Sequence, residues 1–206
     1  MPLISEWEPD AHSLAAIWKI EESEDFFASA TGLESAIKSD KRRIERLAGR
    51  FLLQYLKADF PLHHIAPDEH DKPRIPRNQY YFSISHSYPY IAAMVSNEAE
   101  CGMDIQVWRN RMEVLQHKFL SPGEQSFFDN NVQLITLAWC VKEAAYKWLG
   151  RRGIDFIEQL PITHFKEGLK ESAFILEVKT PERSYNLAVI GRLEADYAIA
   201  HTKIIF

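Results

Sequence analysis

Two stretches of the chain repeat apolar side chains at helical spacing, and each predicts a helix. In residues 40–57 the repeating apolar positions are Ile44, Leu47, Ala48, Phe51, Leu52, Tyr55 and Leu56. Ser39 or Asp40 is placed to cap the start of this helix. A second helix is predicted over residues 133–149, and Gly150 provides its stop signal.

Other segments have the alternation of β-strands. Tyr80, Phe82 and Ile84 alternate with polar or small residues, which predicts a half-buried strand. A turn at Ser87-Tyr88-Pro89 leads into a second, antiparallel strand over residues 90–95. Three further strands are predicted near the C-terminus, at residues 173–179, 184–190 and 197–205.

The strand predicted over residues 101–107 has two different faces. Its apolar side chains share one face, whereas Gly102, Asp104 and Gln106 share the other. Because Gly102 has no side chain, another group can approach this polar face closely. The strand therefore presents a carboxylate and an amide beside an open position.

The remaining signals concern loops and the fold class. Four prolines between residues 61 and 79 predict a loop with extended pieces. Ser121-Pro122-Gly123-Glu124 has the form of a capping box, so a short helix is expected to continue through Phe128. Together these elements predict an α+β fold of two halves with a junction near residue 100; a single α+β domain is the alternative.

Composition places the chain among globular proteins. Its 206 residues can bury a sizeable core, and 46% of them are hydrophobic and 26% charged. No apolar run is long enough to span a bilayer. Glu6, Glu8 and Asp10 interrupt the N-terminus, which argues against a signal peptide. We therefore expect a cytoplasmic protein without a membrane partner, with Cys101 and Cys140 reduced rather than bonded or bound to zinc.

Charge patterning directs attention to the first predicted helix. The net charge of −5 argues against bulk nucleic-acid binding. A basic block, Lys41 to Arg43 with Arg46 and Arg50, nevertheless crowds the N-terminal part of this helix, where the helix dipole disfavours cations. A bound polyanion is one explanation, and a solvated basic face is the other.

Two carboxylates and a lysine are the candidate chemistry. Mg²⁺ is usually held by one or two carboxylates together with substrate phosphates, and Asp104 and Glu143 meet that need if the fold brings them together. Lys147 lies one turn after Glu143 and could neutralise charge on a phosphate. The simpler alternative is that Glu143 and Lys147 form an ion pair that only stabilises their helix.

At these residues the chain resembles the surfactin-type 4′-phosphopantetheinyl transferases. Their Gly-x-Asp-x-Glu strand is matched by Gly102-Met103-Asp104-Ile105-Gln106, and their Trp-x-x-Lys-Glu-x-x-x-Lys helix by residues 139–147. Upstream, Lys72-Pro73 and Ser85-His86-Ser87 resemble the family's Lys-Pro and Ser-His-Ser elements, and residues 46–50 its basic helix.

The resemblance implies a fold and an activity. The fold would be two similar α+β halves, residues 1–100 and 101–206, related by pseudo-twofold symmetry with the active site at their interface. A monomer would then transfer the 4′-phosphopantetheine arm of coenzyme A to a serine of an apo acyl or peptidyl carrier protein, releasing 3′,5′-ADP. Fatty-acid, polyketide and non-ribosomal peptide carriers all remain open as acceptors.

The resemblance also assigns roles to residues. Asp104 and Glu143 would bind Mg²⁺, Glu143 would in addition deprotonate the carrier serine, and Lys147 would contact the reacting phosphate. Gln106 takes the third metal position, where Glu is common; a neutral amide weakens Mg²⁺ binding and leaves that position open to a water. The residues expected to contact coenzyme A are Lys72, Ser85, His86, Arg46, Arg50 and Lys142.

Two other functions compete with this one. Gln106 could mark an eroded metal site, in which case the chain would be a catalytically weak relative that binds a carrier protein or a nucleotide. From residue types alone, an unrelated Mg²⁺-dependent phosphohydrolase is a third hypothesis.

Overall fold

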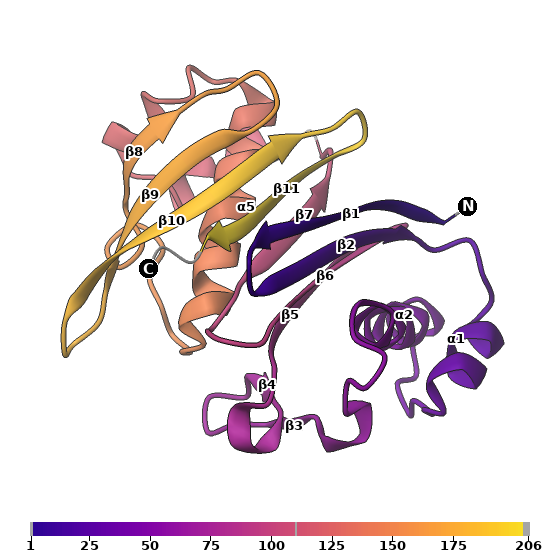
Figure 1. The fold of residues 1–206 in the computed structure, drawn as a ribbon. Helices are drawn as coiled ribbons and strands as arrows, with labels where there is room; N and C mark the ends of the chain where they lie inside the picture. Colours follow the sequence, from indigo (N-terminus) through magenta and orange to yellow (C-terminus); the bar gives the residue numbers. More distant parts are fainter. Residues whose placement is uncertain (1, 110, 204–206) are drawn as a thin grey trace. The chain divides into compact units, whose positions relative to one another are not determined.

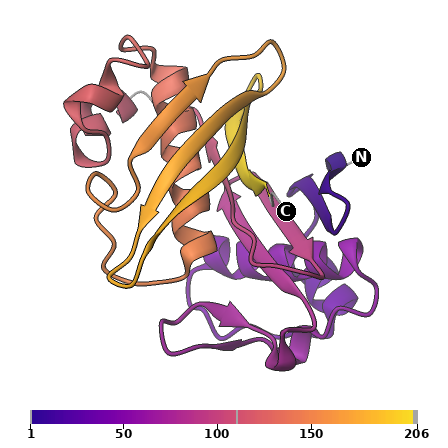
Figure 2. The same cartoon turned by 60° about the vertical axis from the view of Figure 1, so that its left-hand side comes forward.

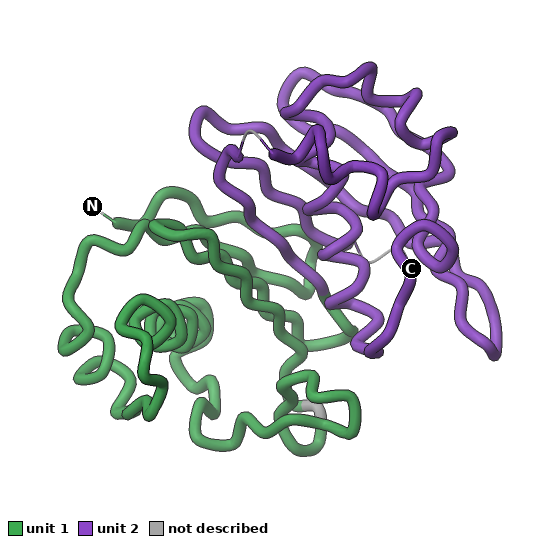
Figure 3. The backbone as a smooth tube through the Cα atoms, turned by 180° about the vertical axis from the view of Figure 1, so that it is seen from behind, with its two compact units in different colours: residues 1–101 green, residues 102–206 purple. Residues whose placement is uncertain are grey.

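The structure is a computed structural model, which describes residues 2–109 and 111–203. The backbone divides into two compact units, Met1–Cys101 and Gly102–Phe206 (Figure 3). The sequence predicts the junction between residues 100 and 101. Each unit combines an antiparallel sheet with helices, so the mixed α and β character predicted from the sequence is confirmed.

The elements of unit 1 are β1 (Leu3–Asp10), β2 (Ser13–Lys19), α1 (Glu24–Thr31), α2 (Asp40–Leu56), β3 (Ala66–Pro67), β4 (Pro73–Arg74), β5 (Tyr81–Ser87) and β6 (Tyr90–Ser96). The elements of unit 2 are β7 (Met103–Val107), α3 (Met112–Leu115), α4 (Pro122–Gln125), α5 (Val132–Leu149), β8 (Ile162–Lys166), β9 (Ser172–Lys179), β10 (Ser184–Leu193) and β11 (Tyr197–Lys203).

Unit 1 is built around α2. In the described part of the chain its main sheet has the order β1-β2-β6-β5, with α2 packed against β2, β5 and β6 (Figure 1). The Ser39 hydroxyl caps α2 by accepting a hydrogen bond from the Arg42 N–H. Leu47 and Leu52 of α2 are buried in one core with Ile91 of β6, so the predicted apolar face does point into the unit.

Unit 2 is built around α5. Within the described residues its sheet has the order β7-β11-β10-β9-β8, and α5 packs against β7, β10 and β11 (Figures 1 and 2). Asn131 caps the start of α5 by accepting from two backbone N–H groups. Gly150, at φ 66°, ends the helix, and its N–H donates to the Tyr146 carbonyl. Both signals fix the helix that positions Glu143 and Lys147.

The two units share one pattern of connection. In unit 1, α1 and α2 follow β2, and β5 and β6 come after the short strands β3 and β4, with β2 paired to β6. In unit 2, α3, α4 and α5 follow β7, and the last two strands are β10 and β11, with β7 paired to β11. The two similar halves and their pseudo-twofold symmetry stay a prediction.

Some boundaries differ from the predicted ones. The capping box at Ser121 and Glu124 is present, but α4 ends at Gln125 rather than continuing through Phe128. Asp129 and Asn130 follow with φ of 42° and 54°, outside the right-handed helical region. The predicted strand 197–205 is seen as β11 to Lys203, and its last two positions lie outside the described residues.

Across residues 2–109 and 111–203, no helix has both the length and the apolar character needed to cross a bilayer.

Candidate active site

The site begins where α5 lies directly against β7. A β-carbon added at Gly102 would overlap the Ala144 carbonyl oxygen of α5, and it would lie 2.8 Å from the Trp148 backbone nitrogen. The predicted close approach at Gly102 is therefore confirmed, and the approaching group is the backbone of α5. Any larger residue would push the helix away from the strand that carries Asp104.

This close packing brings Lys147 onto β7. The Lys147 Nζ lies 2.7 Å from Asp104 Oδ1 and donates a second hydrogen bond, 3.1 Å long, to the Met103 carbonyl. The Asp104 side chain is only 9% exposed and that of Lys147 26%, so this ion pair is mostly shielded from water. Lys147 is thus held by the strand as well as by its own helix.

Glu143, one turn before Lys147, belongs to the same cluster. Burial and, to a smaller extent, the negative charge of Asp104 raise the pKa of Glu143, the positive charge of Lys147 lowers it, and the net pKa is about 7. The structure therefore brings Asp104, Glu143 and Lys147 together. A carboxyl with such a pKa can exchange a proton near neutral pH.

The donor set suits a cation that takes few protein ligands. Among the described residues, no group of three or more His, Cys, Asp or Glu side chains could hold a metal ion. The Gln106 Nε2 donates to the Val107 carbonyl at 2.9 Å, and the amide oxygen of Gln106 as a third ligand stays a prediction. Because Mg²⁺ completes its shell with water and phosphate oxygens, this set fits Mg²⁺ and does not fit an ion that needs a full protein cage.

Lys142, the neighbour of Glu143, points into the core of unit 2. Its Nζ lies 2.5 Å from Glu124 Oε1 and donates to the Phe156 carbonyl at 2.8 Å, and its side chain is 0% exposed. Glu124 also accepts hydrogen bonds from the Ser121 and Ile162 N–H groups. A cofactor could reach Lys142 only if this network opened, and the contact with coenzyme A expected from the resemblance stays a prediction.

The basic face of α2 lines a small cavity in unit 1. Its volume is about 170 Å³, and its lining residues are Leu33, Glu34, Arg46, Leu47, Arg50, Leu62, His63 and Ile65. Burial and the charge of Arg46 lower the pKa of Arg50 to about 10. Neither arginine forms an ion pair with any residue in the described ranges. Two guanidinium groups and one carboxylate, that of Glu34, line the cavity, so its lining carries a net positive charge that favours an anion.

The other predicted coenzyme A contacts also lie in unit 1. The Lys72 Nζ is 2.6 Å from Glu100 Oε2, yet burial and the charge of Arg74 lower the pKa of Lys72 to about 8. Ser85 is buried in β5, whereas the His86 ring is largely exposed with Nδ1 3.3 Å from Glu45 Oε2. Each of these three groups already has partners within the protein, so their contact with phosphate oxygens stays a prediction.

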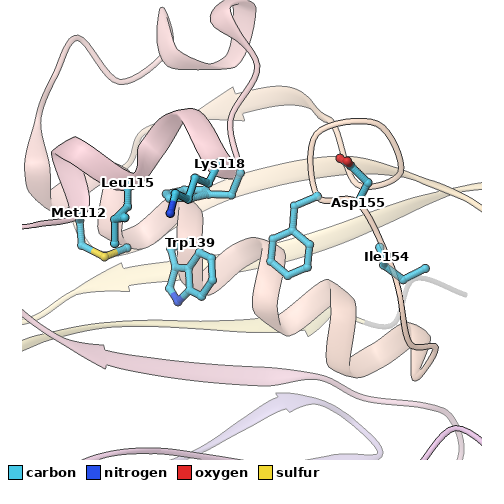
Figure 4. A pocket seen from close by; sticks show the side chains of 8 residues that line it. Met112, Leu115, Lys118, Trp139, Ile154 and Asp155 are labelled. Atoms are coloured by element: carbon cyan, nitrogen blue, oxygen red, sulfur yellow. The ribbon is translucent and has the colours of Figure 1, made fainter.

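An apolar groove in unit 2 was not expected from the sequence. It encloses about 530 Å³ and is lined by Met112, Leu115, Lys118, Phe119, Trp139, Ile154, Asp155 and Phe156 (Figure 4). Trp139 lies on α5 one turn before Glu143, so the groove adjoins the helix face that carries the carboxylate. In the sequence, the four-residue spacing of Trp139 and Glu143 was the signal that an aromatic side chain lies beside the carboxylate.

Comparison with known proteins shows which protein family residues 100–201 resemble. Residues 100–201, which include the Asp104, Glu143 and Lys147 cluster, match the family described as the 4′-phosphopantetheinyl transferase superfamily. This region is therefore similar to that superfamily over just under half of the chain. The narrower surfactin-type group stays a prediction.

Individual relatives agree with this class. Over 127 residues the chain is 34% identical to the 4′-phosphopantetheinyl transferase AcpT of Escherichia coli O157:H7, and equally to AcpT of Escherichia coli strain K12. The aligned region covers 58% of this chain and 64% of each relative, so the chain spans just under two thirds of the length of the curated relatives it matches.

Proposed function

We propose that the chain transfers the 4′-phosphopantetheine moiety of coenzyme A to a serine of an apo acyl or peptidyl carrier protein. The observation that carries this proposal is the convergence of Asp104, Glu143 and Lys147 within the region that is similar to the superfamily. The products are holo carrier protein and 3′,5′-ADP. One bond forms, between the serine oxygen and the β-phosphorus, and the bond from that phosphorus to the bridging oxygen breaks.

Unit 1 supplies the anion contacts for the nucleotide end of coenzyme A. Arg46 and Arg50 form no ion pair with a described carboxylate, and they line a cavity of about 170 Å³ together with Glu34. Lys72, Ser85 and His86 add a cation and two hydrogen-bonding groups from the same unit. Charge-assisted hydrogen bonds from such groups hold phosphates in a fixed orientation.

Unit 2 supplies the chemistry. Asp104 and Glu143, with Gln106 as a weaker neutral ligand, would hold Mg²⁺, and the bound ion would supply positive charge against the pyrophosphate. Glu143 accepts the proton of the serine hydroxyl directly or through a water. Lys147 lies on the same helix face and stabilises the charge that develops on the phosphate as the bond breaks.

The apolar groove beside Trp139 is the surface assigned to the acceptor. Its position one helical turn from Glu143 lets a carrier segment dock near the base that must reach its serine. Its lining contains both Lys118 and Asp155, so apolar contact rather than net charge dominates the surface. The protein works as a cytoplasmic monomer in this proposal.

A mass measurement tests the function. The chain is incubated with coenzyme A, Mg²⁺ and a panel of apo carriers from fatty-acid, polyketide and non-ribosomal peptide systems. We expect at least one carrier to gain the mass of one phosphopantetheine group, and the gain to vanish with EDTA or with a carrier whose acceptor serine is alanine. No gain on any carrier would overturn the proposal.

A binding module is the second candidate, and Gln106 favours it. Its amide is engaged by the Val107 carbonyl, and no third acidic ligand joins Asp104 and Glu143 among the described residues. The Gln106→Glu variant separates the two readings. If the unaltered chain is inert and the Gln106→Glu variant transfers phosphopantetheine, the result supports the binding module. If both proteins transfer it, the result supports the enzyme.

A further inference from the structure

We propose that Lys147 is an exchangeable counter-cation: it neutralises Asp104 in the free protein and must leave that carboxylate before a divalent cation can bind there. This inference rests on the proposed function, because it concerns the same cluster. It goes beyond that function in one respect: without substrate the protein binds divalent cations weakly, and it binds a divalent cation together with its diphosphate substrate.

The Asp104 carboxylate is both the partner of Lys147 and a proposed ligand of the metal ion. Lys147 Nζ is 2.7 Å from Asp104 Oδ1, and the Met103 carbonyl accepts a second hydrogen bond from the same ammonium group. The Asp104 side chain is 9% exposed, so an incoming ion meets the carboxylate already paired and largely covered. An ammonium group at hydrogen-bond distance and a metal ion at coordination distance would repel each other strongly in this shielded position.

Charge counting gives the direction of the effect. With both carboxylates ionised, Asp104 and Glu143 contribute two negative charges and Lys147 contributes one positive charge, so the cluster offers a net charge of about −1 to a divalent ion. Removing the ammonium charge would leave both negative charges available. The free cluster should then bind a divalent cation more tightly, although the same change removes a group that the transfer reaction uses.

A diphosphate changes this balance. Its oxygens bring additional negative charge, so they supply metal ligands and at the same time offer the ammonium group a new partner. The lysine side chain is flexible and carries a compact charge, which suits a move from one oxyanion to another. Lys147 is anchored on α5 one turn after Glu143, so it stays beside the cluster when it releases Asp104.

The experiment measures Mn²⁺ binding to the full chain without coenzyme A or carrier protein. The concentration of free Mn²⁺, followed by electron paramagnetic resonance, gives Kd for the unaltered chain, for Lys147→Gln and for the exposed-lysine control Lys166→Gln. We expect Kd to fall at least about tenfold in Lys147→Gln and to stay unchanged in the control. Adding Asp104→Asn to Lys147→Gln should abolish the gain.

Further variants keep the result decisive. Lys147→Arg retains the positive charge and should bind Mn²⁺ as weakly as the unaltered chain. Thermal unfolding of each variant confirms that the fold is retained. An unchanged or raised Kd in folded Lys147→Gln overturns the inference. Because no transfer is measured, the absence of transferase activity would leave this result unaffected, and failure here would leave the mass assay unaffected.

Discussion

The two long helices, α2 and α5, differ in how some of their cations are compensated, although Arg43 of α2 does pair with Glu24 and Asp40. On α5, Lys142 and Lys147 are each paired with a buried carboxylate, Glu124 and Asp104 respectively. On α2, Arg50 is half-buried beside Arg46, and no described carboxylate forms an ion pair with either. One helix therefore has its charge balanced inside the protein, whereas the other leaves part of its charge to be balanced from outside.

In the proposed function, this difference gives α2 a part in binding an anion and α5 a part in fixing the geometry of the site. An uncompensated, partly desolvated guanidinium raises the energy of the free protein and binds an anion favourably. A balanced ion pair instead fixes geometry, because each partner holds the other in place. We therefore expect substitutions on α2 to alter affinity for coenzyme A, and substitutions on α5 to alter reaction rate or folding.

The largest effect is expected at Glu143. Glu143→Gln removes the base but keeps the shape, so kcat should fall by roughly a thousandfold, the scale of general-base catalysis. The melting temperature should change little, since the carboxyl is already disfavoured by burial and by Asp104. The steady-state rate of carrier modification provides the measurement, with Glu167→Gln at an exposed position as the control. A rate within tenfold of the unaltered chain would remove Glu143 from the chemistry.

Lys142 should affect stability more than chemistry. Lys142→Met leaves Glu124 buried without its partner, which should lower the free energy of unfolding by about 3–5 kcal/mol. Urea unfolding measures the loss. The matched control is Lys179→Met, which breaks the exposed pair with Glu177 and should cost less than about 1 kcal/mol. Equal losses in both variants would contradict the distinction between the buried and the exposed pair.

On α2, Arg50→Met should weaken coenzyme A binding without loss of stability. KM for coenzyme A should rise about 10–100-fold at nearly constant kcat, as expected when one or two charge-assisted phosphate contacts are lost. The free energy of unfolding should stay the same or increase, because an unpaired, half-buried charge is removed. Arg42→Met, at an exposed position of the same helix, serves as the control. A large loss of stability would instead make Arg50 a structural residue.

The smallest effect concerns Lys72 and pH. Its pKa is lowered to about 8, so the ammonium form that attracts phosphate predominates at pH 7 and is mostly lost by pH 9. KM for coenzyme A should therefore rise with pH across this interval, by roughly threefold to tenfold. In Lys72→Met this rise should disappear. The same rise in the variant would show that another group titrates.

Much of the frame that positions the site follows from the sequence. Periodic apolar residues predict α2 and α5, and Gly102 predicts the close approach that places Asp104 next to α5. These features depend on local patterns that few alternative folds could satisfy. The pairing of Asp104 with Glu143 follows only from a family resemblance, because contact between distant residues leaves no local signal.

Other features could not be obtained in this way. The strands β1, β2 and β8 were not predicted; β2 contains the short apolar run Ala15 to Trp18, which helix and strand fit equally well. The burial of Lys142 was missed because a lysine almost never lies in a core unless a partner compensates it, and its partner Glu124 lies 18 positions away. The second partner of Lys142, the Phe156 carbonyl, is a backbone group that no side-chain pattern reveals.

Lys142 and Glu143 are adjacent in the chain but differ in surroundings, since successive residues on a helix point about 100° apart. A mutational screen scored only by survival or product would rank both positions as equally intolerant. We expect Lys142→Met to lower the amount of folded protein, and Glu143→Gln to leave abundant folded protein that is inactive. Measuring protein abundance beside product would separate them, and the same pairing of readouts would sort scaffold from chemistry along the rest of α5.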